Sequence, residues 1–117
     1  MGDIAELTER ILEFRDERDW KQFHTPRNLA TALSIEAAEL QELFLWEEGD
    51  DGSGRSGTVE KESAEVADVL IYALLFCHET GIDPGEAVRR KLEKNRERYP
   101  VDKARGRSTK YTELDED

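Results

Sequence analysis

Residues 65–76 read Glu-Val-Ala-Asp-Val-Leu-Ile-Tyr-Ala-Leu-Leu-Phe, and this stretch decides the fold. When this stretch forms a helix, its apolar side chains occupy nearly every side of that helix. Such a helix must be covered from several directions. Three partner helices of the size that this chain offers would not cover it alone. The sequence therefore predicts an all-α bundle that homo-oligomerisation completes, with this helix near the interface of a homodimer.

The helix boundaries follow from local signals on both sides of this stretch. Thr25 and Asp83 each precede a proline, which is typical of an N-cap followed by Pro at the first helical position. We expect Gly81 to end one helix in a left-handed conformation and Pro100 to stop the next. The pattern predicts a four-helix bundle with helices at residues 4–18, 26–47, 58–80 and 84–98.

The segments between and after these helices are polar or break the helical period. Residues 20–24 are expected to form a loop, and residues 49–57, rich in Gly, Asp and Ser, a flexible polar loop. The length fits one domain. We expect an all-α domain at residues 1–100 and an irregular C-terminal tail at residues 101–117.

Charge is distributed unevenly along the chain. The net charge is −11, which argues against a nucleic-acid polymer as partner because its phosphates would repel the protein. Residues 89–110, however, hold 10 Lys and Arg against 3 Asp and Glu. An acidic body with one basic segment can bind a divalent cation and a polyanion together. A solvated basic helix face explains the same charges equally well.

Other features limit the location of the protein. Cys77 is the single cysteine and lies in an apolar run, so an inert buried thiol is the expected state. The N-terminus lacks the pattern of a signal peptide. No run reaches 18 apolar residues, so we expect no membrane span. These observations predict a cytoplasmic protein.

Two pairs of acids lie on the second and third predicted helices. Glu36 and Glu39 are three residues apart, as are Glu65 and Asp68, so each pair shares a helix face. A short connection favours an antiparallel arrangement of the two helices. If the faces meet, four carboxylates converge and require a cation to stay ionised. Hard oxygen ligands select Mg²⁺ or Mn²⁺ rather than zinc.

Solvated surface acids are the alternative explanation of these pairs. It suits Glu36 and Glu39 taken alone. It suits Asp68 poorly, because Asp is a mediocre helix former and is seldom buried unpaired, yet this one lies among apolar residues. A redox di-iron site would need Glu-x-x-His on two helices, and neither pair has that histidine. The sequence also has no P-loop, nucleophile elbow or zinc spacing.

Aromatic residues extend the two acidic faces. Tyr72 follows Asp68 by four residues, and Trp46 follows Glu39 by seven. Such residues are more often core than ligand pocket, but beside carboxylates they are candidates for stacking on a nucleobase. The loop before the second helix adds Trp20, Phe23 and His24.

Several motifs in this order resemble the MazG-like, all-α nucleoside triphosphate pyrophosphohydrolases, and especially their dCTP pyrophosphatase branch. The resemblance spans roughly residues 11–114. It rests on Arg18-Asp19-Trp20-Lys21-Gln22-Phe23-His24, Pro26-Arg27-Asn28-Leu29, Glu36-Ala37-Ala38-Glu39-Leu40 with Phe44-Leu45-Trp46, Glu65-Val66-Ala67-Asp68-Val69-Leu70-Ile71-Tyr72, Lys91-Leu92-Glu93-Lys94-Asn95-Arg96, Arg98-Tyr99-Pro100, Arg105-Gly106 and Lys110-Tyr111.

The resemblance implies roles for individual residues. Mg²⁺ would be held by Glu36, Glu39, Glu65 and Asp68, which would be the catalytic residues. The base and sugar pocket would be shaped by residues 20–24, including Trp20, Phe23 and His24, together with Trp46 and Tyr72. Contacts near the phosphates would come from Lys91, Asn95, Arg105 and Lys110. Family members assemble as dimers or tetramers.

One departure concerns the metal count. The broader family often has Glu-Glu-x-x-Glu where this chain has Ile35 before Glu36. The missing acid fits the dCTP branch and leaves the number of ions open.

The predicted reaction is Mg²⁺-dependent hydrolysis of a nucleoside triphosphate, dCTP or a related pyrimidine deoxynucleotide, to the monophosphate and pyrophosphate. A phosphoribosyl-ATP pyrophosphohydrolase is the alternative enzyme, and the aromatic-rich loop at residues 20–24 argues against it. A non-catalytic helical interaction module is the alternative from another class.

Overall fold

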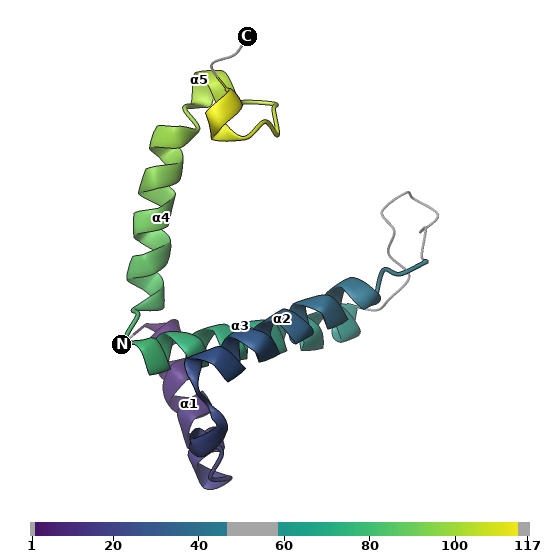
Figure 1. Ribbon diagram of the computed structural model, residues 1–117, viewed down its shortest axis with the longest axis vertical. Helices are drawn as coiled ribbons and strands as arrows, with labels where there is room; N and C mark the ends of the chain where they lie inside the picture. Colours follow the sequence, from purple (N-terminus) through teal and green to yellow (C-terminus); the bar gives the residue numbers. More distant parts are fainter. Residues whose placement is uncertain (1, 47–58, 115–117) are drawn as a thin grey trace. The chain divides into compact units, whose positions relative to one another are not determined.

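The computed structural model describes residues 2–46 and 59–114, and all regular secondary structure within these ranges is helical. The all-α prediction is therefore confirmed. Chain contacts divide the protein into two compact units, residues 1–82 and 83–117. The elements, labelled in Figure 1, are α1 (Asp3–Glu17), η1 (Lys21–Phe23), α2 (Pro26–Glu42), α3 (Val59–Thr80), α4 (Pro84–Arg98), α5 (Val101–Ala104) and η2 (Tyr111–Glu113).

The first unit consists of α1, η1, α2 and α3. The helices α2 and α3 lie side by side and antiparallel (Figure 1), and α1 packs against α3. Leu29 of α2 and Leu75 of α3 are the buried apolar residues among those described in this unit, with 1% and 4% of their surfaces exposed. Arg15 of α1 is buried to the same degree as Leu75. A single copy of the first unit thus has a small core.

The capping signals in the sequence act as expected. The Thr25 hydroxyl accepts a hydrogen bond from the Asn28 backbone N–H at 3.2 Å, and the Asp83 carboxylate accepts one from the Glu86 N–H at 3.0 Å. Gly81 adopts a φ of 72°. The Ile82 N–H then bonds to the Cys77 carbonyl at 2.9 Å, which closes α3 in a Schellman motif.

The helix α2 ends earlier than the predicted residue 47. It stops at Glu42 and continues as a tighter turn, in which the N–H groups of residues 43–45 bond to carbonyls three residues back. Trp46 has a φ of 65°, so the helical register does not continue through it. The last turn of α2 has no basic residue and ends in an acid, which the negative end of the helix dipole disfavours. The predicted loop at 49–57 and the Thr58 cap lie outside the described residues.

Two segments expected to be irregular contain short helical turns. The loop after α1 includes the 3₁₀ turn η1. The tail contains α5, for which Pro100 is the N-cap residue, and the turn η2. In the second unit, the Tyr111 ring lies edge-on to Tyr99, with centroids 5.9 Å apart, and beneath the Arg98 guanidinium at 4.6 Å. These contacts fold the tail back on the end of α4.

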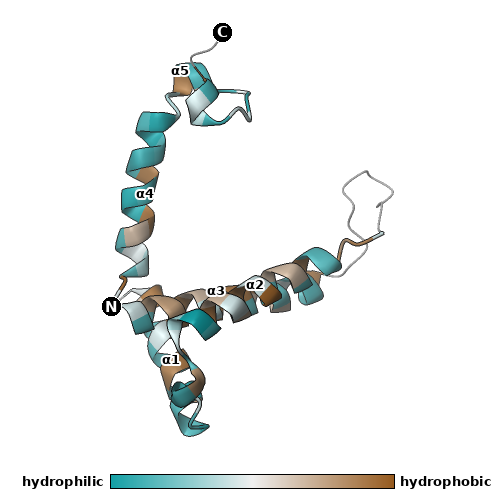
Figure 2. Ribbon diagram, viewed as in Figure 1, coloured by the Kyte–Doolittle hydropathy of each residue, from teal (hydrophilic) through white to brown (hydrophobic). Residues whose placement is uncertain are grey.

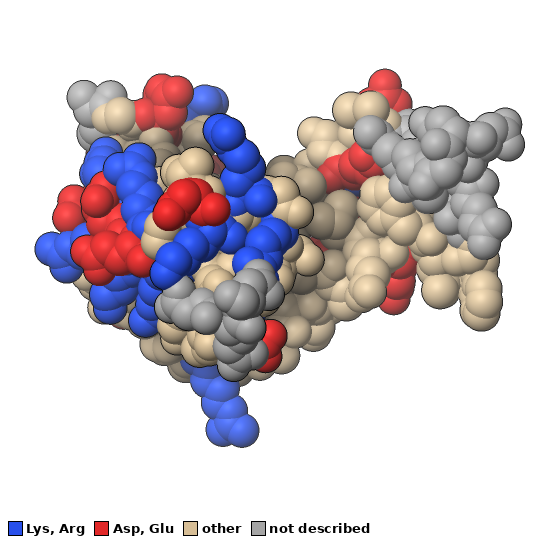
Figure 3. Space-filling model, turned by 90° about the horizontal axis from the view of Figure 1, so that it is seen from above, with Lys and Arg blue, Asp and Glu red and all other residues tan. Residues whose placement is uncertain are grey.

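Charged side chains predominate on α4, whereas α3 carries exposed apolar side chains. Figure 2 shows hydrophilic residues over most of α4, and in Figure 3 basic side chains gather over α4 and the tail. On α3, Val66 and Leu70 are 41% and 56% exposed in the single chain. Among the described residues, no helix combines the length and the apolar character needed to cross a membrane.

Candidate functional site

Carboxylates from α2 and α3 meet between the two helices. Glu36, Glu65 and Asp68 each offer one oxygen, and the three oxygens lie within 4.8 Å of one another. The residues are partly buried. Their approach follows from the i,i+3 spacing on α3 and from the antiparallel packing of α2 against it. The structure therefore brings together three of the four acids selected from the sequence.

The fourth acid, Glu39, lies against this group. Its hydrogen bond to Glu36 is the main reason that the pKa of Glu36 rises from 4.5 to about 7, and burial and the neighbouring negative charges add to the rise. Burial raises the pKa of Glu65, with the charge of Glu39 as the next cause. Repulsion among the carboxylates thus destabilises the cluster, and a bound cation would relieve this repulsion.

Unpaired oxygens show that the cluster suits a metal ion. Glu36 and Glu65 each have a buried Oε2 atom without a hydrogen-bond partner. A buried acceptor left unpaired destabilises the fold, whereas a bound cation would satisfy it. Carboxylate oxygens are the ligands that Mg²⁺ and Mn²⁺ prefer. The residues present therefore fit a hard divalent ion.

A cavity of about 660 Å³ opens between α1, the loop after it, and α3. Its wall is largely apolar, and Asp68 belongs to both this wall and the carboxylate cluster. Three of the predicted pocket residues, Trp20, His24 and Tyr72, also line it. A volume of this size suits a drug-sized ligand with a few polar contacts. The cluster and the cavity are thus adjacent parts of one site.

Two of the predicted aromatic residues lie elsewhere in the first unit. Phe23 is 59% exposed and is not part of the cavity wall. Trp46 is 91% exposed, because α2 ends four residues before it and the chain turns there. The helical spacing that related Trp46 to Glu39 does not apply beyond the end of α2.

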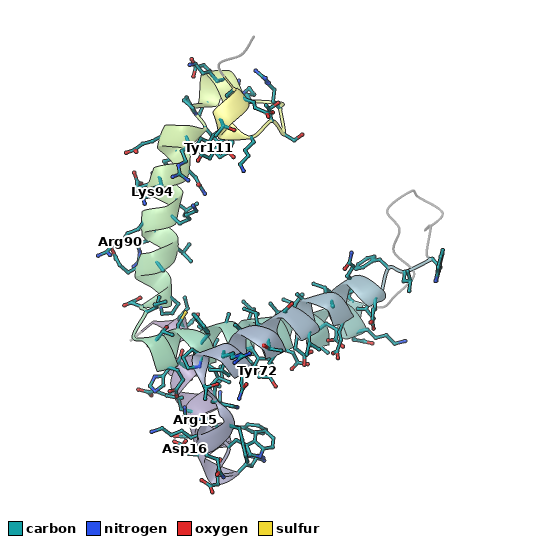
Figure 4. The ribbon with its side chains drawn as sticks, viewed as in Figure 1. Arg15, Asp16, Tyr72, Arg90, Lys94 and Tyr111 are labelled. Atoms are coloured by element: carbon teal, nitrogen blue, oxygen red, sulfur yellow. The ribbon has the colours of Figure 1, made fainter. Side chains whose placement is uncertain are left out.

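The predicted phosphate contacts belong to the second unit. Lys91 and Asn95 lie on α4, Arg105 follows α5, and Lys110 precedes η2. The three basic residues are exposed and Asn95 is partly buried. Figure 4 labels Arg90 and Lys94, two further bases of α4.

A buried charge pair at the cavity was not predicted from the sequence. Arg15 lines the cavity and its Nη1 donates to Glu79 Oε1 at 2.8 Å. Figure 4 shows Arg15 on α1. A signal was present, because Arg15 lies four residues after Ile11 and eight after Leu7, on the apolar face of α1. No local pattern indicated its partner, which is 64 residues away.

An all-α unit with a carboxylate cluster between two antiparallel helices identifies an all-α protein with a candidate site for a divalent cation. The sequence profile of the MazG-like family matches residues 31–114. This chain belongs to the MazG-like family, as the motifs suggested.

Particular relatives sharpen this assignment. The chain is 46% identical over 106 residues to dCTP pyrophosphatase 1 of Mus musculus and 47% identical over 106 residues to that of Homo sapiens. Each alignment covers 87% of this chain, which spans 62% of the length of the curated relative. A pyrophosphatase crystal structure from Archaeoglobus fulgidus superimposes with a TM-score of 0.78 at 44% identity, covering 86% of this chain and 94% of that one.

Proposed function

We propose that this protein hydrolyses deoxynucleoside triphosphates, with dCTP or a related pyrimidine nucleotide as substrate, to the monophosphate and pyrophosphate in a reaction that requires Mg²⁺. The observation that carries this proposal is the double role of Asp68. It belongs to a carboxylate cluster suited to a divalent ion and to the wall of a cavity lined by Trp20, His24 and Tyr72. A nucleotide has the same two parts, an anionic phosphate chain and an apolar base.

The chemistry follows from the charge of the substrate. Mg²⁺ would neutralise the triphosphate and lower the pKa of the attacking water. The water oxygen forms a bond to the α-phosphorus, and the bond from this phosphorus to the bridging oxygen of the pyrophosphate breaks with its electron pair. The water gives its proton to a carboxylate of the cluster that is not fully engaged with the ion. The ion would be held by Glu36, Glu39, Glu65 and Asp68, and one of these carboxylates would serve as the general base.

The nucleobase of the substrate would enter the cavity next to Asp68. Trp20, His24 and Tyr72 come from two elements, the loop after α1 and the middle of α3. Burial, followed by the positive charge of Arg15, lowers the pKa of His24, so its imidazole is neutral at neutral pH. A neutral imidazole carries one donor and one acceptor nitrogen, so His24 in the cavity wall can exchange a hydrogen bond with the edge of a nucleobase. The names of the relatives indicate cytosine as that base.

We also propose that a homo-oligomer is the working form and that the second unit supplies phosphate contacts. Val66 and Leu70 leave apolar area of α3 uncovered in one copy. Lys91, Arg105 and Lys110 are exposed cations, which would stabilise the leaving pyrophosphate together with Asn95. Phe23 and Trp46 would complete the pocket in the assembly.

Pyrophosphate release from a panel of deoxynucleoside and nucleoside triphosphates tests the activity. We expect release from dCTP and other pyrimidine deoxynucleotides with Mg²⁺ or Mn²⁺, and none in excess EDTA. Phosphoribosyl-ATP belongs in the same panel as the alternative substrate. Release of pyrophosphate at an undiminished rate in EDTA would refute the metal requirement. The absence of release from every nucleotide would refute the proposed enzymatic activity.

A further inference from the structure

A buried ion pair joins α1 to α3 beside the cavity. The Arg15 side chain is 5% exposed, and that of its partner Glu79 is 21% exposed. The Arg15 Nε donates to Asp16 Oδ1 at 2.9 Å, but the Asp16 side chain is 58% exposed. Desolvation makes a buried pair sensitive to the loss of either partner, whereas an exposed pair contributes little. Glu79 is therefore the partner that fixes the Arg15 guanidinium.

The backbone of Arg15 holds the start of the aromatic loop. Its carbonyl oxygen accepts hydrogen bonds from the Arg18 N–H at 3.2 Å and from the Trp20 N–H at 3.1 Å. The Trp20 ring lies edge-on to Phe14, with centroids 5.7 Å apart. A displacement of Arg15 would thus be transmitted directly to the backbone and ring of Trp20.

The far end of the loop responds to the same pair. The electrostatic influence of both Arg15 and Glu79 reaches His24, where Arg15 lowers the pKa of the imidazole and Glu79 raises it. The Phe23 carbonyl accepts a hydrogen bond from the Asn28 side chain at 3.0 Å, which ties this end to α2. The loop is therefore attached to α1 at Trp20 and to α2 at Phe23, and its Trp20 and His24 line the same cavity as residues of α3.

We propose that Arg15 and Glu79 are positioning residues, which hold the loop at residues 20–24 at a fixed distance from α3 and so set the shape of the base pocket. This inference rests on the proposed function in one respect, because the pocket is assigned to the base. Neither residue is required to touch the reacting phosphates. The pair acts on binding and base choice through Trp20 and His24.

Steady-state kinetics on three variants and a control test the role. Glu79→Gln keeps the size of the side chain and removes its charge, and Arg15→Glu places two acids together. The double variant Arg15→Glu/Glu79→Arg reverses the pair. Asp16→Asn is the control, because it removes only the exposed partner. Misplacement of binding groups can cost up to about a hundredfold, so we expect each single variant to raise KM for dCTP about tenfold or more with kcat little changed. Preference among bases should fall in parallel, the double variant should recover part of KM, and the control should match the wild type.

Trp20 fluorescence gives a readout that does not depend on activity. The chain has two tryptophans, so Trp20 is the only tryptophan that emits in a Trp46→Phe background. In that background, Glu79→Gln and Arg15→Glu should increase acrylamide quenching of Trp20, and the reversed pair should restore it. This measurement remains informative even if no nucleotide is hydrolysed, which separates a failure of this proposal from a failure of the proposed function.

The outcomes distinguish positioning from simple stabilisation of the fold. A lower melting temperature with unchanged KM, base preference and quenching would overturn the proposal and leave the pair a structural link between α1 and α3. Raised KM and quenching in both single variants with recovery in the double variant would support it. Equal effects of Asp16→Asn and Glu79→Gln would also overturn it, since the buried partner would then have no special role.

Discussion

Glu36 of α2 and Asp68 of α3 present carboxylate oxygens within 4.8 Å of each other, although 31 residues separate them in sequence. Negative charges this close repel each other in a partly dry site, and Asp68 contributes to the raised pKa of Glu36. The two helices are thus packed against each other in spite of this repulsion. A cation would convert the repulsion into attraction.

Asp68→Asn separates the catalytic role of this acid from its effect on stability. Removal of one negative charge relieves repulsion in the metal-free protein, so its melting temperature should stay equal or rise, while hydrolysis should fall by orders of magnitude. Calorimetric titration should show weaker Mn²⁺ binding. Glu60→Gln, an exposed acid near the start of α3, is the matched control and should change none of these quantities. Strong destabilisation of metal-free Asp68→Asn would instead indicate a structural hydrogen bond.

The stability of the metal-free protein should decrease as pH rises from about 5 to about 8. The pKa of Glu36 is raised in the folded state from 4.5 to about 7, so folding favours its protonated form. This contribution is fully present below pH 4.5 and is lost as pH passes through about 7. The raised pKa of Glu65 acts in the same direction. Thermal melting in EDTA across this range measures the slope.

Two changes should flatten that slope. The Glu36→Gln side chain cannot ionise, so it contributes no slope. Saturating Mg²⁺ binds the ionised carboxylates of the folded state and so offsets the stability that is lost when they give up their protons. A melting temperature that rises with pH over the same range in EDTA would contradict the electrostatic account of the cluster.

Local geometry explains what the sequence could predict. The helix caps at Thr25 and Asp83 depend on residues within three positions, and the meeting of Glu65 with Glu36 depends on helical spacing and one short connection. The predicted end of α2 was wrong. High helix propensity extends the predicted helix past Glu42, whereas the acidic residue at the C-terminal end disfavours further helix. The pairing of Arg15 with a residue on α3 could not be predicted, since it depends on how two helices pack.

An oligomer is expected because α3 keeps apolar side chains exposed in a single copy. Val66 is 41% exposed and is not part of the cavity wall. Light scattering at micromolar concentration should give at least twice the 13.4 kDa mass of one chain. Val66→Glu should lower the mass, because the charge would be buried at an interface. Ser63→Glu, at an exposed polar position of α3, is the control and should leave the mass unchanged. A monomer mass for the wild-type protein would refute the assembly.

Trp46 offers the sharpest test of how the base pocket is completed. The residue is 91% exposed in one copy, so truncation to alanine should change the free energy of unfolding of a single chain by no more than about 0.5 kcal/mol. If its ring stacks on the base, a loss of about 1–3 kcal/mol of binding corresponds to an increase in KM of roughly 5- to 150-fold in Trp46→Ala. The effect on kcat should be smaller, because the base lies away from the bond that breaks.

The backbone at Trp46 provides the control for this prediction. Its φ of 65° lies in the left-handed region, which glycine adopts without a steric penalty. Trp46→Gly should therefore be more stable than Trp46→Ala by about 1 kcal/mol, while both variants lose the ring and should show the same rise in KM. Melting and kinetics on the two variants separate backbone strain from base stacking. A large drop in melting temperature in both, with KM unchanged in the folded fraction, would assign Trp46 to a packed interface and remove it from the site.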